Sequence, residues 1–110
     1  MAMDLTSQQS ESEIDQRIRR GINERRLLQL RYQQRERIIE PHDYGIQNGA
    51  LRLLAFQVGG SSSGRLPNWR WLDVAQMSDV QLLDRKFQGG RPSGRHHKWD
   101  QLFVRVAPPD

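Results

Sequence analysis

An apolar segment at residues 51–58 follows directly after the pair Asn48-Gly49. Asn-Gly is the dipeptide that most favours the tight turn of a β-hairpin, so the segment is expected to be the second strand of a hairpin. One face of that strand carries Leu51, Leu53 and Ala55, and the other carries Leu54, Phe56 and Val58. Because both faces are apolar, the strand is expected to be central in a sheet and buried on both sides.

A helix is expected before the strands, over residues 12–25. Ile14, Ile18 and Ile22 recur at the spacing of one helical face. A capping-box signal precedes them, made by Ser10 and Ser12 with Glu13 and Asp15. Residues 1–11 are polar and lack a periodic pattern, so we expect a disordered tail there.

The remaining segments read as short strands. Residues 28–32 and 35–39 are expected to pair through a turn at 33–35, and Pro41 is expected to end the second strand at a corner, residues 42–45. After a loop at 59–68, strands are expected at 69–77 and 80–83, with a turn at Ser78-Asp79 between them and a loop at 88–98 after them. Residues 102–106 are expected to form a last strand, or a helix if Trp99-Asp100 caps it, and the strand is favoured. This order predicts a mainly β fold: one domain, residues 12–106, forming a small, strongly bent antiparallel barrel with one N-terminal helix. Residues 107–110 are expected to be disordered.

Composition excludes several classes of protein. The 110 residues include no Cys, so disulfide frameworks, thiolate nucleophiles and Cys-based metal sites are excluded. No apolar run approaches the roughly 20 residues of a spanning helix, and the N-terminus lacks the features of a secretory signal. A soluble, cytoplasmic protein is expected, and a chain this short favours neither a large cofactor nor a deep active site.

Basic residues are concentrated after residue 16. The formal net charge is +4, but residues 1–16 hold four acidic residues and no basic one, so the rest carries +8. Of the 17 basic residues all but Lys86 and Lys98 are Arg, whose planar guanidinium matches phosphate oxygens. The pattern indicates an anionic partner, nucleic acid above all. The alternative is that the Arg content reflects genome base composition and a plainly soluble surface.

No set of residues forms a recognisable catalytic group. Adjacent histidines on a strand point to opposite faces, and the tract around His96-His97 is typical of a solvated basic loop. We therefore expect neither a catalytic residue nor a metal ligand, and no enzyme. A small metal-dependent hydrolase using His42, His96 and His97 is a third alternative, which predicts stoichiometric metal uptake.

His42, Tyr44 and the three tryptophans each have two interpretations. His42 and Tyr44 either face a pocket or fix the corner after Pro41 as buried polar groups. Trp69 and Trp99, beside Arg70 and Lys98, either stack on bases or complete the core. For Trp71 a place in the core is favoured.

The segments Arg37-Ile38-Ile39-Glu40-Pro41 and Asn48-Gly49, followed by the strand up to Phe56, resemble the WYL domain family. The similarity covers roughly residues 22–87 and extends to small stand-alone bacterial WYL-like proteins through E-P-H-x-Y-G, Q-x-G-G-S and F-x-G-x-R-P. It implies an Sm-like barrel and a ligand-sensing role in bacterial regulation, with nucleic acid bound by several members. Of the triplet that names the family only Leu53 is present, because Leu51 and Arg52 replace Trp and Tyr, and residues 1–25 are too short for the usual helix-turn-helix.

Together these observations predict a non-enzymatic module that binds an anionic ligand, single-stranded nucleic acid or a nucleotide. The residues expected to bind it are Arg37, His42, Tyr44, Arg52, Trp69, Arg70, Arg91, Arg95 and Lys98. Arg37, Arg52, His42 and Tyr44 are taken from the resemblance. The alternative is a protein-interaction or oligomerisation module, in which the N-terminal helix or a sheet edge joins a second copy or a regulatory partner.

Overall fold

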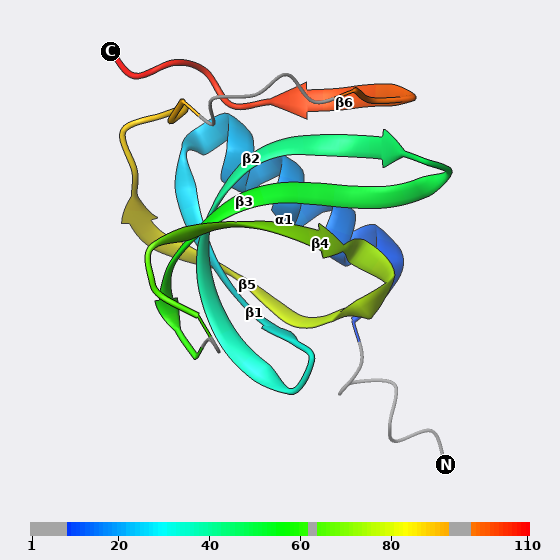
Figure 1. Cartoon of the computed structure of the whole chain (residues 1–110), viewed down its shortest axis with the longest axis horizontal. Helices are drawn as coiled ribbons and strands as arrows, with labels where there is room; N and C mark the ends of the chain where they lie inside the picture. The colour runs from blue at the N-terminus through cyan, green and yellow to red at the C-terminus, as the bar shows by residue number, and fades with distance from the viewer. Residues whose placement is uncertain (1–8, 62–63, 93–97) are drawn as a thin grey trace.

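One helix is followed by six antiparallel strands in the computed structural model, which describes residues 9–61, 64–92 and 98–110 (Figure 1). The elements are α1 (Glu11–Glu24), β1 (Arg26–Tyr32), β2 (Arg35–Gln47), β3 (Ala50–Gly60), β4 (Asn68–Asp73), the 3-10 helix η2 (Val74–Gln76), β5 (Met77–Lys86) and β6 (Gln101–Arg105). The mainly β class with one N-terminal helix is confirmed. None of the helices in these ranges is long and apolar enough to cross a membrane.

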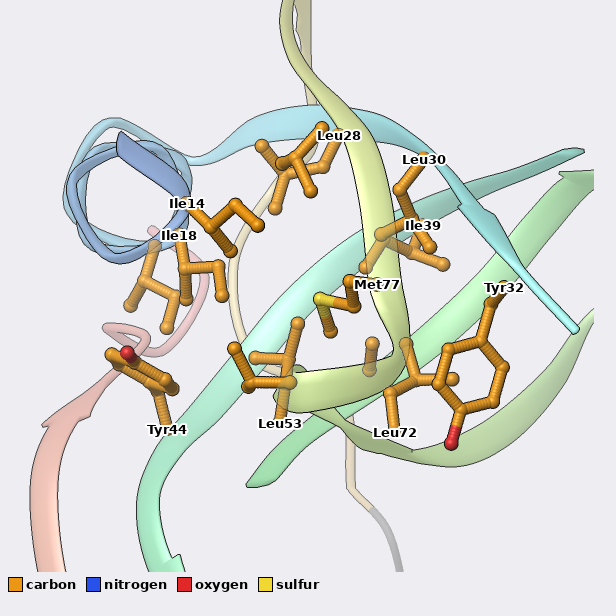
Figure 2. Packing of buried hydrophobic residues seen from close by; sticks show 14 of the residues in the cluster. Ile14, Ile18, Leu28, Leu30, Tyr32, Ile39, Tyr44, Leu53, Leu72 and Met77 are labelled. Atoms are coloured by element: carbon orange, nitrogen blue, oxygen red, sulfur yellow. The ribbon is translucent and has the colours of Figure 1, made fainter. Parts of the chain in front are cut away.

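Helix α1 begins at the predicted capping box and packs on the sheet. The Ser10 hydroxyl accepts the backbone N–H of Glu13 at 3.1 Å, and the Glu13 carboxylate accepts the N–H of Ser10. Ile14, Ile18 and Ile22 are buried, and Figure 2 shows Ile14 and Ile18 pointing from the helix toward the core residues of the strands. The helix ends at Arg25, which adopts the left-handed conformation at φ 54°.

The sheet is open rather than a closed barrel. Its strand order is β4-β3-β2-β1-β5, and β6 pairs with β2 beyond the stretch that pairs with β1. Closure would require β4 to pair with β5, and no such pairing occurs in the described part of the chain. The described strands therefore form a six-stranded antiparallel sheet that is not hydrogen-bonded into a ring, so a closed barrel is not confirmed.

Side chains occupy the edge of β5 at which closure would take place. The side-chain amide of Gln9 donates to the carbonyl of Val80 and accepts its N–H, both at 2.7 Å. Arg17 donates to the same carbonyl at 3.0 Å. Both backbone groups of Val80 are thus already hydrogen-bonded to side chains.

Strand β2 passes through Pro41, which is a correction to the expected corner at residues 42–45. β2 pairs with β1 up to Ile39 and with β6 from Asp43, so Pro41 lies between the two partners, next to a register shift against β3. A proline is tolerated there because no ladder hydrogen bond to β1 or β6 is lost. Helix α1 approaches at Gly21, where a Cβ would lie 3.1 Å from Cγ of Pro41.

Two further boundaries differ from expectation. The strand that starts at Asn68 ends at Asp73, because η2 turns the chain into β5 before residue 77. Ser78-Asp79 is not a turn between strands but a bulge within β5, where Asp79 adopts φ 52° and the register against β1 shifts. β5 therefore continues to Lys86, beyond the predicted end at residue 83.

Strand β3 is central, between β2 and β4, and its middle is buried on both faces. Leu53 and Ala55 belong to the core under α1, together with residues from β1, β2, β4 and β5. Figure 2 shows Leu53 among them. On the other face an aromatic cluster, defined as His42, Phe56, Trp69 and Phe87, brings the segment after β5 against the sheet. Leu51, Phe56 and Val58 are only half-buried, so burial on both sides holds for the middle of the strand and not for its ends.

Candidate anion-binding site at Arg37

Arg37 places a positive charge inside the protein. It lies on β2, paired with Leu30 of β1 and Gly60 of β3, and only 7% of it is exposed. Its guanidinium donates to the backbone carbonyl of Tyr32 at 3.4 Å and to side-chain oxygens of Gln33 at 3.4 Å and Gln57 at 3.1 Å. The guanidinium carbon also lies 5.4 Å from the centre of the Tyr32 ring. Each of these contacts is with a neutral group.

No carboxylate of the described residues forms an ion pair with Arg37. Those residues include every acidic residue of the sequence except Asp4. Burial lowers the pKa of Arg37, and the positive charges of Arg70 and Arg35 lower it further. A buried charge without a counter-ion is costly, so this part of the protein is electrostatically suited to an anion from outside.

Gln57 connects Arg37 to a second arginine and to a loop. Its side chain is fully buried, and its Oε1 accepts from Nη1 of Arg37 at 3.1 Å and from Nε of Arg70 at 3.2 Å. Its Nε2 donates to the carbonyls of Gly59 and Ser61, both at 3.0 Å. Two guanidinium groups therefore donate to one neutral amide oxygen.

The start of the β3–β4 connection is held directly over Arg37. The N–H of Ser61 donates to the carbonyl of Glu36 at 2.7 Å. Gly60 adopts φ +82°, and a Cβ at this position would lie 2.3 Å from the carbonyl oxygen of Glu36 and 2.7 Å from Cα of Arg37. Only glycine allows this approach. Ser61 is exposed, so the loop forms part of the rim of the site.

Arg52 and Arg91 are predicted site residues that the fold places beside carboxylates. Nε of Arg52 lies 3.1 Å from Oδ1 of Asp73, and its Nη1 donates to Gln47 at 2.9 Å. Arg91 makes two hydrogen bonds to Glu40, at 2.7 and 3.0 Å, and its guanidinium lies 4.4 Å from the centre of the Phe56 ring. Both arginines are neutralised within the protein and are not gathered with Arg37.

His42 and Tyr44 are buried and serve as internal hydrogen-bonding groups. Nε2 of His42 accepts the backbone N–H of Arg91 at 3.1 Å, so Nδ1 carries the proton and donates to the carbonyl of Glu40 at 2.9 Å. Burial lowers the pKa of His42, against the opposing effect of its bond to Glu40. The hydroxyl of Tyr44 donates to Asp15 of α1 at 2.7 Å, and burial followed by this bond raises the pKa of Tyr44.

The tryptophans are not positioned to stack on a ligand held by Arg37. Trp69 and Arg70 are consecutive on β4, so their side chains point to opposite faces of the sheet. The Trp69 ring lies 4.8 Å from that of His42 and 5.2 Å from that of Phe56, and Trp99 lies 5.5 Å from Trp71. Neither Trp69 nor Trp99 therefore lies where its ring could stack on a ligand bound to Arg37.

The remaining predicted residues lie on the C-terminal segment. Lys98 has an exposed side chain, and its backbone carbonyl accepts from Gln47 at 3.0 Å. Arg95 lies outside the described residues, as do His96 and His97 of the metal alternative. Within the described ranges no group of three or more acidic or histidine side chains is arranged to hold a metal ion.

Gln57, Ser61 and Tyr32 were not predicted as site residues, although Gln57 and Ser61 begin and end the motif Q-x-G-G-S. One signal was available: Gln57 is a polar residue inside an otherwise apolar segment, on a strand expected to be buried on both sides. A fully buried amide needs hydrogen-bond partners, so its position pointed to a polar group from another strand. The identity of that group depends on the register between β2 and β3, which local sequence does not specify.

The arrangement can hold an anion by charge and hydrogen bonds. Three of the five N–H donors of the Arg37 guanidinium bond to acceptors among the described residues. Comparison of the chain with protein-family models, with curated proteins and with solved structures found no match.

Proposed function

We propose that this protein is a non-enzymatic, WYL-like module that binds a phosphate-bearing ligand, a single-stranded nucleic acid or a nucleotide, at Arg37. The observation that carries the proposal is the buried guanidinium of Arg37, 7% exposed and without a carboxylate partner among the described residues. A second guanidinium, from Arg70, donates to the same oxygen of Gln57. A buried guanidinium whose described partners are all neutral favours an anionic ligand.

Support for the WYL-like part of the proposal comes from the order of elements. One helix precedes a run of antiparallel strands, and Arg37 and Pro41 lie on β2 before the Asn48-Gly49 hairpin. We propose that the open sheet is a variant of the Sm-like barrel in which β4 and β5 are joined by η2 without pairing.

A phosphate-bearing ligand fits the charge distribution of the whole chain. The part of the sequence after residue 16 carries a formal charge of +8. Arg31, Arg35, Arg65 and Arg85 make no ion pair with any described carboxylate, and Arg35 is close enough to Arg37 to affect its pKa. Such unpaired arginines attract an extended polyanion before it reaches the site.

The alternative, a protein-interaction module, has less support. The apolar stripe of α1 that was expected to join a partner is buried on the protein's own sheet through Ile14, Ile18 and Ile22. At one sheet edge, that of β5, the backbone groups of Val80 are already bonded to Gln9 and Arg17. Neither the apolar face of α1 nor this part of the β5 edge is therefore free to join a second chain.

Fluorescence anisotropy with a labelled single-stranded oligonucleotide, at two salt concentrations, tests the proposal. We expect affinity to fall with salt with a logarithmic slope of about −0.7 for each phosphate contact. Arg37→Met is expected to weaken binding by roughly 10- to 100-fold, which corresponds to one charge-assisted hydrogen bond. Competition by a free nucleotide shows whether the ligand is a nucleotide or a polymer.

The matched control is Arg20→Gln. Arg20 is exposed on α1 and its partner Glu24 keeps a second arginine, Arg26, so the substitution removes the same formal charge without disturbing the fold. Equal affinity of the two variants, or absence of binding at low salt, would refute the proposal. A circular dichroism melt of each variant shows that any loss is not due to unfolding.

A further inference from the structure

A pocket of about 600 Å³ lies beside the segment that follows β5. We call it the Phe87 pocket, and it is lined by Leu27, Glu40, Val58, residues 85–92 and Pro109. Strands β1, β2, β3 and β5 therefore all contribute to its walls. Its volume is within the range of small-molecule sites, roughly 300–1,000 Å³, so it can accept a small organic ligand.

Hydrogen bonds to the rest of the protein hold the wall formed by residues 87–91. The N–H of Phe87 donates to the carbonyl of Arg25 at 2.9 Å, and the N–H of Arg91 donates to Nε2 of His42 at 3.1 Å. The Phe87 ring also stacks on that of His42, with ring centres 5.7 Å apart. Because the wall is already held in place, a ligand does not have to order it on binding.

The charges that line the Phe87 pocket are mostly positive. Among the described residues that line it, Arg85, Lys86 and Arg91 are cations and Glu40 is the acid. Glu40 accepts two hydrogen bonds from Arg91, at 2.7 and 3.0 Å, so these two charges balance each other. Arg85 and Lys86 are exposed, and neither forms an ion pair with a carboxylate of the described residues. The excess positive charge suits an anionic group.

Apolar side chains line the same pocket. Leu27 is buried, at 3% exposure, but it does not belong to the core under α1. Val58 and Phe87 are half-buried, and Pro92 and Pro109 are exposed. A ligand with an apolar part would cover these side chains and remove apolar surface from water, which a small polar anion would leave exposed.

We propose that the Phe87 pocket binds a small amphipathic anion, in which one anionic group is joined to an aliphatic or aromatic part. The anionic group is held by the positive charge of Arg85 and Lys86. The apolar part covers Leu27, Val58 and Phe87. The inference does not rest on the proposed function, because Arg37 is not among the residues that line this pocket.

NMR titration of the isotope-labelled protein with hexanoate, 1-hexanol and acetate tests the inference. Hexanoate has both an anionic group and an apolar chain, 1-hexanol has the chain alone, and acetate has the anionic group with one methyl. We expect hexanoate to bind about tenfold more tightly than either of the others. It is expected to shift the backbone amide signals of Val58, Gly89 and Gly90, and to leave those of Arg37 and Gln57 in place.

Substitution of the two unpaired cations locates the anionic group. Arg85→Gln and Lys86→Gln are each expected to weaken hexanoate binding about threefold, and the double variant about tenfold, with the binding of 1-hexanol unchanged. Arg20→Gln, which removes the same charge on α1 and outside the pocket, is the control and is expected to bind hexanoate like the original protein. A circular dichroism melt of each variant shows that the fold is retained.

Four results would overturn the inference. Absence of hexanoate binding would show that the pocket does not take this class of ligand. Equal binding of hexanoate and 1-hexanol would show that charge does not contribute, and equal binding of hexanoate and acetate would show the same for the apolar walls. Unchanged affinity in the double variant would place the anion elsewhere. None of these results bears on the proposed function, which is tested with the oligonucleotide and Arg37→Met.

Discussion

The hydroxyl of Tyr44, in the middle of the sheet, donates a 2.7 Å hydrogen bond to Asp15 on helix α1. Tyr44 is fully buried and its ring packs against Phe103 of β6, with ring centres 5.8 Å apart. Asp15 also accepts two hydrogen bonds from Arg19 one turn along the helix. A directional polar contact therefore accompanies the apolar packing of the helix and fixes its rotation on the sheet.

Tyr44→Phe is expected to destabilise the protein by about 1–2 kcal/mol, because it removes a hydrogen bond to a charged group and keeps the ring. The free energy of unfolding, measured by urea titration, checks this. Asp15→Asn, which keeps an acceptor oxygen, is the control and is expected to cost less. A Tyr44→Phe variant as stable as the original protein would show that the hydroxyl does not help to dock α1.

Arg37→Met is expected to cost less stability than Arg91→Met, although Arg37 is the more deeply buried of the two residues. Arg37 has no carboxylate partner in the described structure, so its replacement removes a buried charge and is expected to change stability by no more than about 1 kcal/mol. Arg91→Met leaves the carboxylate of Glu40, 5% exposed, without its partner and is expected to cost about 3 kcal/mol. Denaturant titration of both variants measures the difference. If Arg37→Met costs more stability than Arg91→Met, Arg37 serves the stability of the protein rather than the binding of a ligand.

Gly60 and Gly49 form a matched pair of substitutions. Both adopt positive φ, +82° and +78°, but a Cβ at Gly49 meets nothing within 4 Å, whereas at Gly60 it would collide with the carbonyl of Glu36. Gly49→Ala is expected to cost about 1 kcal/mol for the left-handed backbone alone. Gly60→Ala is expected to cost about 2 kcal/mol more, because the loop must move away from Arg37. If Gly49→Ala and Gly60→Ala lose the same stability in thermal melts, the close approach of residue 60 to the backbone of Glu36 does not contribute to stability.

His42 is expected to make the protein less stable in mild acid. Burial lowers its pKa from 6.5 in the folded protein, so the unfolded chain binds a proton at a higher pH than the folded chain does. The stability is therefore fully present above about pH 6.5 and is lost as pH falls toward the folded pKa, with a slope of up to about 1.4 kcal/mol per pH unit. Glu40 and Asp43 oppose this effect and Arg91 adds to it, but burial is the largest cause.

Urea titrations between pH 7.5 and pH 5 measure this loss, and His42→Gln is the control. Glutamine does not titrate, so the variant is expected to lack the part of the pH dependence that comes from residue 42. If the variant and the original protein lose stability in parallel over this range, the protonation of His42 is not the cause.

Local signals predicted those parts of the fold that depend on neighbours in sequence. The capping box at Ser10, the isoleucine stripe of α1 and the turn at Asn48-Gly49 are confirmed, because helix starts and tight hairpins are specified within a few residues. Pro41 was misread for the opposite reason. Whether a proline interrupts a strand depends on which strands lie beside it, and β2 changes its partner from β1 to β6 at that point.

The candidate site could be predicted only in part. Arg37 and Arg70 were named from the sequence, and the fold brings both to Gln57. Arg52 and Arg91 were named on the same grounds, but each has a carboxylate partner, Asp73 or Glu40, that is far from it in sequence. Composition shows how many guanidinium groups a chain has, whereas the tertiary fold decides which of them are balanced internally.

Gln9 and Arg17, which bond the backbone of Val80 in β5, hinder the addition of a further strand at that position. Because Gln9 satisfies both hydrogen-bonding groups of Val80, a stray extended chain finds no open ladder there. Truncation through residue 9 would free the N–H of Val80, while Arg17 would still bond its carbonyl. Gln9, just before α1, thus contributes to protecting the sheet against association with another chain.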